Sequence, residues 1–295
     1  MKSLPGMTAA LFVLAGFACS TGTERSLRVA PTGQWTDIAV TFSVDGVESS
    51  VEARTYFPAE YSSRRGRTVI LLHDYGGSSR DWGANTEVRR YADKYAIVLV
   101  CPSMGATQYE TAYYPETRTR WGAVPGGGWV STVLVPFLRR EYGVARNRAS
   151  TGIAGIGTGA RGALLVASSN ADMFGAAAGL SGYYDMMALT QNQALMAVYG
   201  RFAEFKERWL RDDNILELAV NLEKTPVFLA HGDKDTTVPI EQSRLLGIRL
   251  NNLHKKNESG YVVEYRETRN QSHEWKLWRG MAADMMAFFN AHLTN

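Results

Sequence analysis

The sequence predicts an α/β fold with a mostly parallel central sheet, helices on both faces and an antiparallel N-terminal hairpin. From residue 68 onward, short apolar runs alternate with amphipathic stretches, which is typical of parallel strands joined by crossover helices. Before that point, alternating apolar residues at 37–44 and 51–57 flank the dipeptide Asp45-Gly46. Two such runs around a turn dipeptide indicate a hairpin.

Each element beyond the hairpin follows from its own pattern. Continuous apolar runs predict buried strands at residues 69–72, 97–100, 151–156, 174–180, 227–230 and 261–265. Helical periodicity or small-residue composition predicts helices at residues 82–95, 129–142, 159–169, 245–253 and 275–292.

Two long stretches, 102–128 and 182–225, are not needed for the sheet. The first is loop-like and rich in aromatic residues, whereas the second is expected to be helical around residues 189–210. Ligands of open α/β sheets bind at the carboxyl ends of the strands, where insertions form walls. We therefore expect both stretches to contribute to a cap and a pocket, although their aromatic residues could equally serve local packing.

Composition excludes several classes of function. The 32 basic and 29 acidic residues give a net charge of +3 and are spread along the chain, so nothing indicates a nucleic-acid partner. A hydrophobic fraction of 45% is typical of a globular domain with a sizeable core, and we interpret residues 35–295 as one domain. The Cys and His residues nowhere have the spacing of metal ligands, so a metal site is not expected. Cys101 lies at the end of an apolar run, which predicts a buried free thiol.

The first nineteen residues have the composition of a secretory signal. Lys2 precedes an apolar segment at residues 7–18, and small residues at 16 and 18 precede Cys19. Two outcomes remain open: soluble export, or a lipoprotein in which Cys19 carries the lipid. Residues 20–34 are then expected to form a flexible tether, and membrane contact is expected only through such an anchor.

The segment Gly155-Ile156-Gly157-Thr158-Gly159 has the pattern of a nucleophile elbow. It follows an apolar strand and opens a small-residue helix. Such a turn requires small residues two positions before and after the nucleophile, and Gly155 and Gly159 meet that requirement. The glycine spacing does not match a dinucleotide fingerprint, so the elbow interpretation is favoured.

An acid and a histidine follow in the chain order of a Ser-Asp-His triad. Asp235 lies in the loop after the strand at 227–230, and His273 lies in a polar loop after the strand at 261–265. Asp235 would fix the imidazole tautomer and stabilise the imidazolium, whereas Asp233 better fits a turn cap. Among the other histidines, His254 and His292 are expected at the surface.

His231 is expected to have a structural role at the end of its strand. The stretch 71–77, which includes His73 and Asp74, ends the first parallel strand. Its backbone can turn an N–H toward a developing oxyanion, and the amides of Tyr75 and Thr158 are the expected pair of donors.

These segments together resemble the esterase family of α/β-hydrolases that includes esterase D, S-formylglutathione hydrolases, feruloyl esterases and mycolyltransferases. The segment Ser272-His273-Glu274-Trp275-Lys276-Leu277-Trp278-Arg279 is similar to the family pattern Gly-His-x-Trp-x-x-Trp-Arg. The other stretches that carry the resemblance are 71–82, 129–142, 150–164, 176–185 and 231–239. The resemblance covers roughly residues 68–293 and implies an α/β-hydrolase fold and acyl-ester chemistry through a serine, without a cofactor.

The chain departs from this pattern at the nucleophile. Family members have Gly-x-Ser-x-Gly at the elbow, and here Gly157 takes the place of the serine, so no acyl-enzyme can form there. Asp74 replaces the commoner glycine after His73, and its carboxylate would oppose negative charge near the oxyanion hole. Ser181 is a poor substitute because nothing around it resembles an elbow, and Thr158 is expected to contribute its amide.

Two hypotheses follow for a protein with a small-molecule ester or acyl partner. In the first, it is an exported carboxylic-ester hydrolase whose activity is impaired, with Asp235 and His273 activating a water or another nucleophile. In the second, it is a pseudoenzyme that binds an ester, acyl or sugar ligand. Retention of Asp235 and His273 favours the first hypothesis, and Gly157 favours the second.

Overall fold

One mixed sheet organises the fold. The computed structural model describes residues 26–62, 66–257 and 260–295, so the expected signal segment and Cys19 lie outside the described residues. Eight strands lie in the order β1-β2-β4-β3-β5-β6-β7-β8. Their bounds are β1 Trp35–Val44, β2 Val47–Tyr56, β3 Thr68–Leu72, β4 Val98–Pro102, β5 Thr151–Ile156, β6 Ala176–Leu180, β7 Val227–Gly232 and β8 Val263–Thr268.

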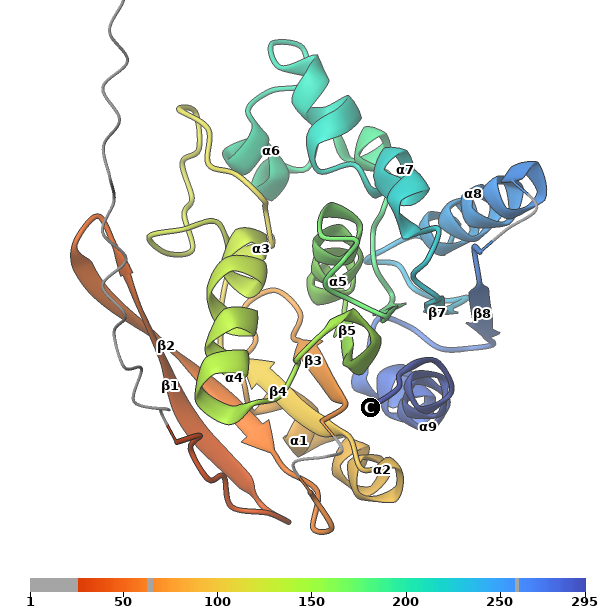
Figure 1. The fold of residues 1–295 in the computed structure, drawn as a ribbon. Coiled ribbons are helices and arrows are strands. Elements are labelled where there is room, and N and C mark those ends of the chain that lie inside the picture. The colour runs from red at the N-terminus through yellow and green to blue at the C-terminus, as the bar shows by residue number, and fades with distance from the viewer. Residues whose placement is uncertain (1–25, 63–65, 258–259) are drawn as a thin grey trace, which may run out of the picture.

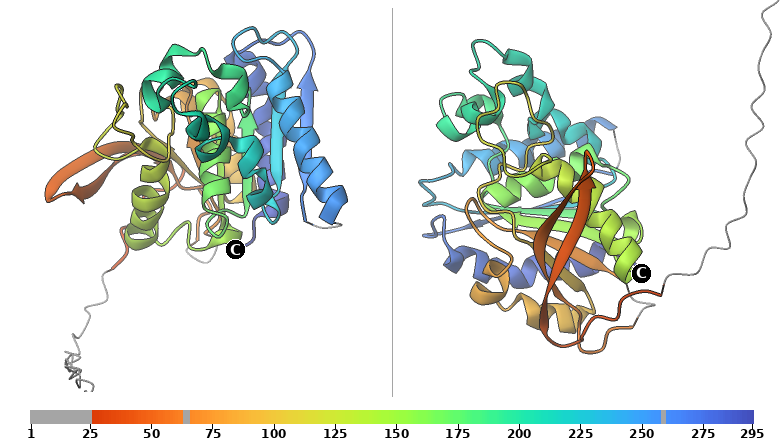
Figure 2. Two further views of the ribbon diagram at one scale, coloured as in Figure 1. Left: turned by 90° about the horizontal axis from the view of Figure 1, so that it is seen from above. Right: turned by 90° about the vertical axis from the view of Figure 1, so that its left-hand side faces the viewer.

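The sheet confirms the predicted mixture of strand directions. β1 and β2 form an antiparallel hairpin, β2 pairs antiparallel with β4, and the remaining pairs are parallel. The hairpin projects at one edge of the sheet (Figure 2). The strands from β3 to β7 are almost wholly buried, since helices cover both of their faces.

The helices form a layer on each face (Figure 1). One layer holds α1 (Asp81–Asn85), α2 (Val88–Tyr95) and α9 (Trp275–His292). The other holds α5 (Thr158–Ser169), α7 (Ile215–Leu218), α8 (Glu241–Asn257) and a continuous helix made of α3 (Gly126–Trp129), a π-helical segment (Val130–Leu134) and α4 (Val135–Tyr142). α6 (Gln193–Tyr199) lies with the short helices of residues 182–225 above the strand ends. Separate hydrophobic clusters fill the two sides of the sheet.

The prediction of one helix at 82–95 was wrong. Thr86 has an extended backbone (φ −135°, ψ 163°) and separates α1 from α2. Its hydroxyl donates to the Trp82 carbonyl at 2.7 Å and accepts from the Val88 N–H at 3.2 Å, so one side chain serves the end of α1 and the start of α2. The strand predicted at 174–180 begins at Ala176, and the helix predicted at 245–253 extends over Glu241–Asn257.

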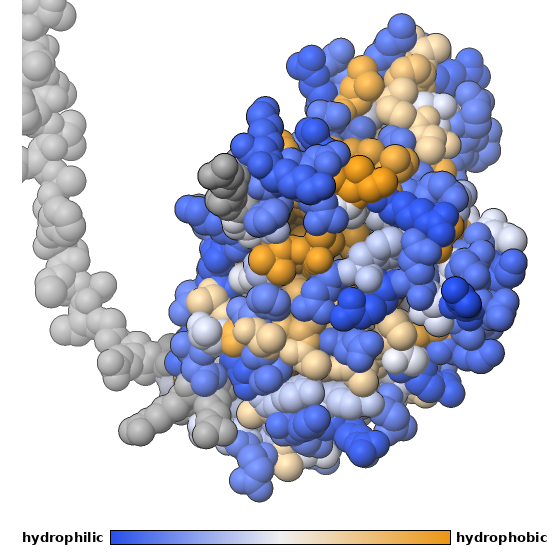
Figure 3. Space-filling view, turned by 90° about the vertical axis from the view of Figure 1, so that its right-hand side faces the viewer, coloured by the Kyte–Doolittle hydropathy of each residue, from blue (hydrophilic) through white to orange (hydrophobic). Residues whose placement is uncertain are grey.

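The described part of the expected tether, residues 26–34, contacts α4. The Arg28 N–H donates to the Glu141 carbonyl at 2.7 Å, and the Arg28 guanidinium pairs with the Glu141 carboxylate at 2.9 Å. No helix among the described residues is both long enough and apolar enough to cross a membrane. On the face nearest β8 and α8, apolar residues form small patches within a mostly hydrophilic surface (Figure 3).

Sheet register places the candidate functional residues together. Leu72 at the end of β3 lies opposite Gly155 of β5, and Ile156 lies opposite Leu180 of β6. The residues that follow β3, β5, β6 and β7 therefore emerge at the carboxyl-terminal end of the sheet, because neighbouring parallel strands end on the same side. His73, Gly157 and the loop that contains Asp235 directly follow the ends of β3, β5 and β7.

We expect Gly159→Ala to lower the free energy of unfolding by about 1–3 kcal/mol, the usual cost of overpacking a tight contact. A Cβ at Gly159 would lie 2.4 Å from the backbone oxygen of His73, which is fixed by its own loop. Gly280→Ala is the matched control, because that glycine lies in α9 with nothing within 4 Å of an added Cβ. The control should gain up to about 1 kcal/mol from helix propensity in urea unfolding, and equal effects of the two variants would contradict the close approach.

Candidate active site

The turn from β5 to α5 has the geometry of a nucleophile elbow. Gly157 lies at its tip with φ +53° and ψ −120°, a backbone conformation that residues other than glycine adopt only under strain. A Cβ at Gly155 would lie 2.1 Å from the Gly159 carbonyl oxygen, and one at Gly159 would meet the backbone of the β3 loop. The predicted need for glycine at both flanking positions follows directly from these approaches.

Asp235 and His273 meet at the same carboxyl-terminal end of the sheet. The Asp235 Oδ2 atom lies 2.8 Å from His273 Nδ1, while its Oδ1 accepts hydrogen bonds from the backbone N–H groups of Thr237 at 2.9 Å and Val238 at 2.8 Å. The Asp235 side chain is fully buried and that of His273 is 10% exposed. The His273 ring packs edge-on against Trp278, with centroids 5.1 Å apart. The imidazole is therefore held with Nε2 toward the elbow.

His231 supports the acid, in agreement with its predicted structural role. Its buried ring places Nε2 at 2.9 Å from the Val238 carbonyl and 3.2 Å from Asp235 Oδ2. Since both of these partners are acceptors, Nε2 carries a proton, and Nδ1 lies 2.7 Å from the Ser243 hydroxyl.

The carboxylate of Asp74 occupies the centre of the site. Its Oδ1 accepts the backbone N–H groups of Tyr75 and Thr158, each at 2.8 Å. Its Oδ2 lies 3.2 Å from His273 Nε2. A Cβ on Gly157 would lie 2.2 Å from Asp74 Oδ1. The Tyr75 and Thr158 amides thus converge on a protein carboxylate, which fills the space where a side chain at position 157 would lie.

This placement refines the expectation for Asp74. The sequence suggested a carboxylate beside the expected oxyanion hole that would oppose developing charge, whereas in the structure one of its oxygens binds both of the amides expected to form that hole. The space above Gly157, which the missing serine side chain would leave empty, is filled by the same carboxylate. The sequence signal for this was the joint departure at positions 74 and 157, because the absence of a side chain at Gly157 creates the room that Asp74 takes.

His73 and Tyr109 fix the loop that presents Asp74. His73 is buried, its Nδ1–H donates to the Asp74 carbonyl at 2.6 Å, and its Nε2 accepts the Met104 N–H at 2.8 Å. Burial lowers the pKa of His73, which keeps the ring neutral in these roles. The Tyr109 hydroxyl donates to the His73 carbonyl at 3.0 Å. Asp74 is therefore presented by an anchored loop.

The site holds a cation between two anions. Burial alone would lower the pKa of His273, but hydrogen bonds to Asp235 and Asp74 and the charges of both carboxylates raise it to about 9. Burial would raise the pKa of Asp74, yet hydrogen bonds from His273, Thr158 and Tyr75 outweigh it and lower the pKa. The same competition, with hydrogen bonds from His231, His273 and Val238, lowers the pKa of Asp235. At neutral pH the resting site is therefore carboxylate, imidazolium and carboxylate.

Other candidate residues do not face the site. Ser181 is fully buried and its hydroxyl accepts the Trp278 indole N–H at 3.1 Å, so it is not presented as a nucleophile. His254 is exposed on α8, whereas His292 is half-buried against Phe288 and so less exposed than expected. Cys101 is buried, which raises the pKa of its thiol.

A pocket of about 290 Å³ opens onto Asp74 and His273. Both long stretches identified in the sequence contribute to its wall, the first through Gln108 and the second through Tyr183 and its neighbours. The remaining lining residues are Tyr75, Thr158, Leu189, Asn192, Ala194, Thr237, Val238 and Pro239. The volume suits a small organic molecule. In the described part of the chain, no three or more His, Cys, Asp or Glu side chains gather as a metal site requires.

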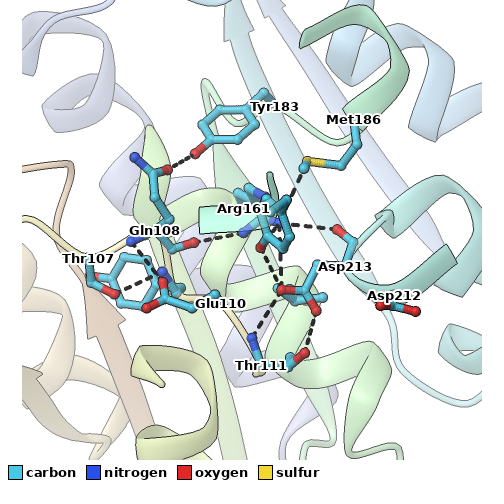
Figure 4. Close-up of polar contacts among 12 residues, drawn as sticks. Thr107, Gln108, Glu110, Thr111, Arg161, Tyr183, Met186, Asp212 and Asp213 are labelled. Atoms are coloured by element: carbon cyan, nitrogen blue, oxygen red, sulfur yellow. Dashed lines mark hydrogen bonds and ion pairs between the residues drawn. The ribbon is translucent and has the colours of Figure 1, made fainter. Parts of the chain in front are cut away.

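A buried arginine, which no sequence pattern marked as a site residue, joins the two cap stretches to α5 (Figure 4). Arg161 has no exposed surface and donates to the Gln108 carbonyl at 2.7 Å, the Tyr199 hydroxyl at 2.9 Å and the Asp213 carbonyl at 3.2 Å. The Asp213 carboxylate in turn accepts from Tyr199 at 2.6 Å and from the Thr111 N–H at 3.0 Å. The only sequence signal was one charged residue in a helix of small apolar residues.

The fold and the Asp235–His273 pair facing an elbow define an α/β-hydrolase of the serine-esterase type. The chain belongs to the family described as "Putative esterase", whose model matches residues 45–289. An acetyl esterase from Caldicellulosiruptor saccharolyticus is 25% identical over 108 residues, which cover 37% of this chain and 38% of that protein. The chain thus aligns with less than half of this curated relative, and both matches associate it with ester hydrolysis in general.

Solved structures show the same fold. An S-formylglutathione hydrolase from Agrobacterium tumefaciens is 15% identical, with a TM-score of 0.71 over 91% of this chain and 99% of that chain. A ferulic acid esterase is 16% identical with a TM-score of 0.66 over 88% of this chain and 100% of that chain. The fluorophosphonate-binding serine hydrolase F of Staphylococcus aureus is 13% identical with a TM-score of 0.66, over 88% and 99%.

The raised pKa of His273 predicts a distinctive titration. We expect its ring to stay protonated at pH 7.5 and to titrate near 9. In Asp74→Asn the pKa should fall by about 1 to 3 pH units, because a nearby opposite charge no longer favours the imidazolium. The measurement is NMR of ring-labelled histidine, assigned with His273→Gln.

The same shift fixes the sign of a pH effect on stability. The folded-state pKa of His273 lies above its ordinary value of 6.5, so its ion pairs contribute fully below pH 6.5 and that contribution is lost as the pH rises through about 9. A wild-type His273 that titrates near 6.5 would contradict the arrangement of two carboxylates around one imidazolium.

Proposed function

We propose that this protein is an exported member of the esterase family that binds a small carboxylic ester or acyl compound in the Asp74 pocket and hydrolyses such esters only weakly. One observation supports the weak hydrolysis: the Asp74 carboxylate fills the space of a side chain at position 157 and binds the Tyr75 and Thr158 amides, which we assign to the oxyanion hole. A serine esterase needs a nucleophile next to the imidazole and two free amides for the tetrahedral intermediate.

Three features oppose serine-type catalysis at this site. Gly157 supplies no nucleophile. The Tyr75 and Thr158 amides are already bound to Asp74, so a substrate carbonyl would have to displace a carboxylate to reach them. The imidazolium at His273 cannot accept a proton at neutral pH while both carboxylates are charged. Loss of a triad serine leaves about 10³-fold acceleration over water, and here the oxyanion hole is filled as well.

Features retained from the family support ligand binding. The pocket, its two-part cap and the Asp235–His273 pair are all present, and Arg161 anchors the cap to the helix after the elbow. A cavity of this size with mixed apolar and polar lining is the usual form of a small-molecule site. The proposed substrate class, small-molecule esters, follows from the family match.

Restoring serine esterase activity should require two changes. Gly157→Ser alone should stay near wild-type activity, because its Cβ would lie 2.2 Å from Asp74 Oδ1 and the hydroxyl would compete with the carboxylate for the same space. Asp74→Gly/Gly157→Ser frees the amides and supplies the nucleophile. We expect this double variant to exceed the wild type by at least about 10²-fold in kcat/KM on a short-chain aryl ester.

The two single variants are the controls. Asp74→Gly should leave esterase activity low, since it opens the hole without a nucleophile. Circular dichroism and thermal unfolding establish that each variant is folded. Wild-type activity equal to that of a folded double variant, or a large gain from Gly157→Ser alone, would refute the proposal that Asp74 blocks ester hydrolysis.

Export is proposed from the N-terminal segment alone. The apolar stretch 7–18 before Cys19 supports either soluble release or lipid attachment at Cys19. Expression with radiolabelled palmitate in a bacterial host separates the two. Labelling that is lost in Cys19→Ser indicates a lipoprotein, cleaved unlabelled protein in the periplasm or medium indicates soluble export, and uncleaved protein in the cytosol contradicts both.

A further inference from the structure

The contacts of Asp74 differ from those of a carboxylate that merely fills a gap. Oδ1 is held by two backbone amides at 2.8 Å, whereas Oδ2 has the His273 ring at 3.2 Å. The side chain is 31% exposed and lines the pocket. The two oxygens are thus distinct: one is fixed in an oxyanion hole, and the other lies beside an imidazole at the pocket.

We propose that Asp74 is a carboxylate nucleophile, and that this site hydrolyses small compounds that carry a leaving group on a saturated carbon. This reaction goes beyond the ester-binding function proposed above and uses the same pocket. The geometry favours a saturated carbon over an acyl carbon. Attack on an acyl group would create a substrate oxyanion, and the two amides that could stabilise it already hold Oδ1.

The first step is displacement at the saturated carbon. The Oδ2 lone pair attacks that carbon, an Oδ2–C bond forms, and the bond to the leaving group breaks with its electron pair. A halide leaves as the anion, and an epoxide oxygen leaves as an alkoxide that takes a proton from solvent. The product is an alkyl ester of Asp74, in which Oδ1 becomes the carbonyl oxygen and remains between the Tyr75 and Thr158 amides.

The second step is hydrolysis of that alkyl ester by water. The bond breaks at Cγ, and the developing negative charge lies on Oδ1, which the two amides already bind. His273 Nε2 removes a proton from the attacking water and returns it to the departing alcohol, while Asp235 stabilises the imidazolium. Asp74 is regenerated with one oxygen from water, and its new carboxylic acid releases the second proton of that water. The net reaction converts a halide and water into an alcohol, a halide anion and a proton, and an epoxide and water into a diol.

The electrostatics of the site assist this sequence. In the resting state the two carboxylates keep His273 protonated. Alkylation removes the charge of Asp74, so the pKa of His273 falls and the ring can release its proton to solvent and act as a base. The base therefore becomes available after the covalent intermediate has formed. The pocket volume of about 290 Å³ limits the substrate to a small molecule.

The experiment uses 1-bromobutane and 1,2-epoxybutane as probes with the wild-type protein, His273→Gln and Asp74→Asn. His273→Gln lacks the base and should accumulate one butyl or hydroxybutyl group, which peptide mass spectrometry places on Asp74. Asp74→Asn should lose the adduct and any bromide or diol release. A single turnover of the wild-type protein in ¹⁸O-labelled water should place one labelled oxygen in Asp74.

The outcomes are separable. Adducts with one probe only assign the leaving-group class, as halide or epoxide. No adduct on Asp74 with either probe in folded His273→Gln, an adduct on another residue, or labelled oxygen in the alcohol but not in Asp74 would overturn the nucleophile. Such a result would not alter the aryl-ester comparison of the Asp74 and Gly157 variants, which tests the ester-binding proposal independently.

Discussion

The site depends on one interaction: a single carboxylate that accepts two backbone amides through Oδ1 and contacts an imidazolium through Oδ2. These contacts join the loops after β3, β5 and β8 at the carboxyl-terminal end of the sheet. Charge-assisted hydrogen bonds are the strong class of polar contact, and in a largely buried site little water competes with them. The charge of Asp74 therefore raises the pKa of His273, and its Oδ1 occupies the two amides that the proposed function assigns to a substrate carbonyl.

Gly157 and Asp74 are physically coupled. An elbow needs its tip residue at positive φ, and a side chain there would collide with the carboxylate that now fills the site. A serine at position 157 and an aspartate in this conformation at position 74 are mutually exclusive, so neither position can be interpreted alone. The same coupling explains why a site with a complete acid–histidine pair can lack the nucleophile without leaving an empty space above the elbow.

The cap illustrates a similar dependence on distant residues. Arg161, one helical turn beyond the elbow, reaches backbone and side-chain groups from both inserted stretches. Its full burial requires these partners, because an unpaired buried guanidinium would be far too costly. The cap is thereby attached to the helix that supplies the Thr158 amide, and the polar network of Arg161 includes Gln108, which lines the pocket.

The sequence by itself determined the fold class, the succession of strands and helices along the chain, the elbow pattern and the pairing of Asp235 with His273. Each of these depends on local patterns: apolar periodicity, glycine spacing, and polar residues directly after strands. It failed where a single residue acts across elements, as when Thr86 divides a helix or Arg161 spans a cap. Only the tertiary structure decided where the Asp74 carboxylate goes, because that position depends on the space left by Gly157, a residue 83 positions away in the chain, and on amides that converge only once the sheet has formed.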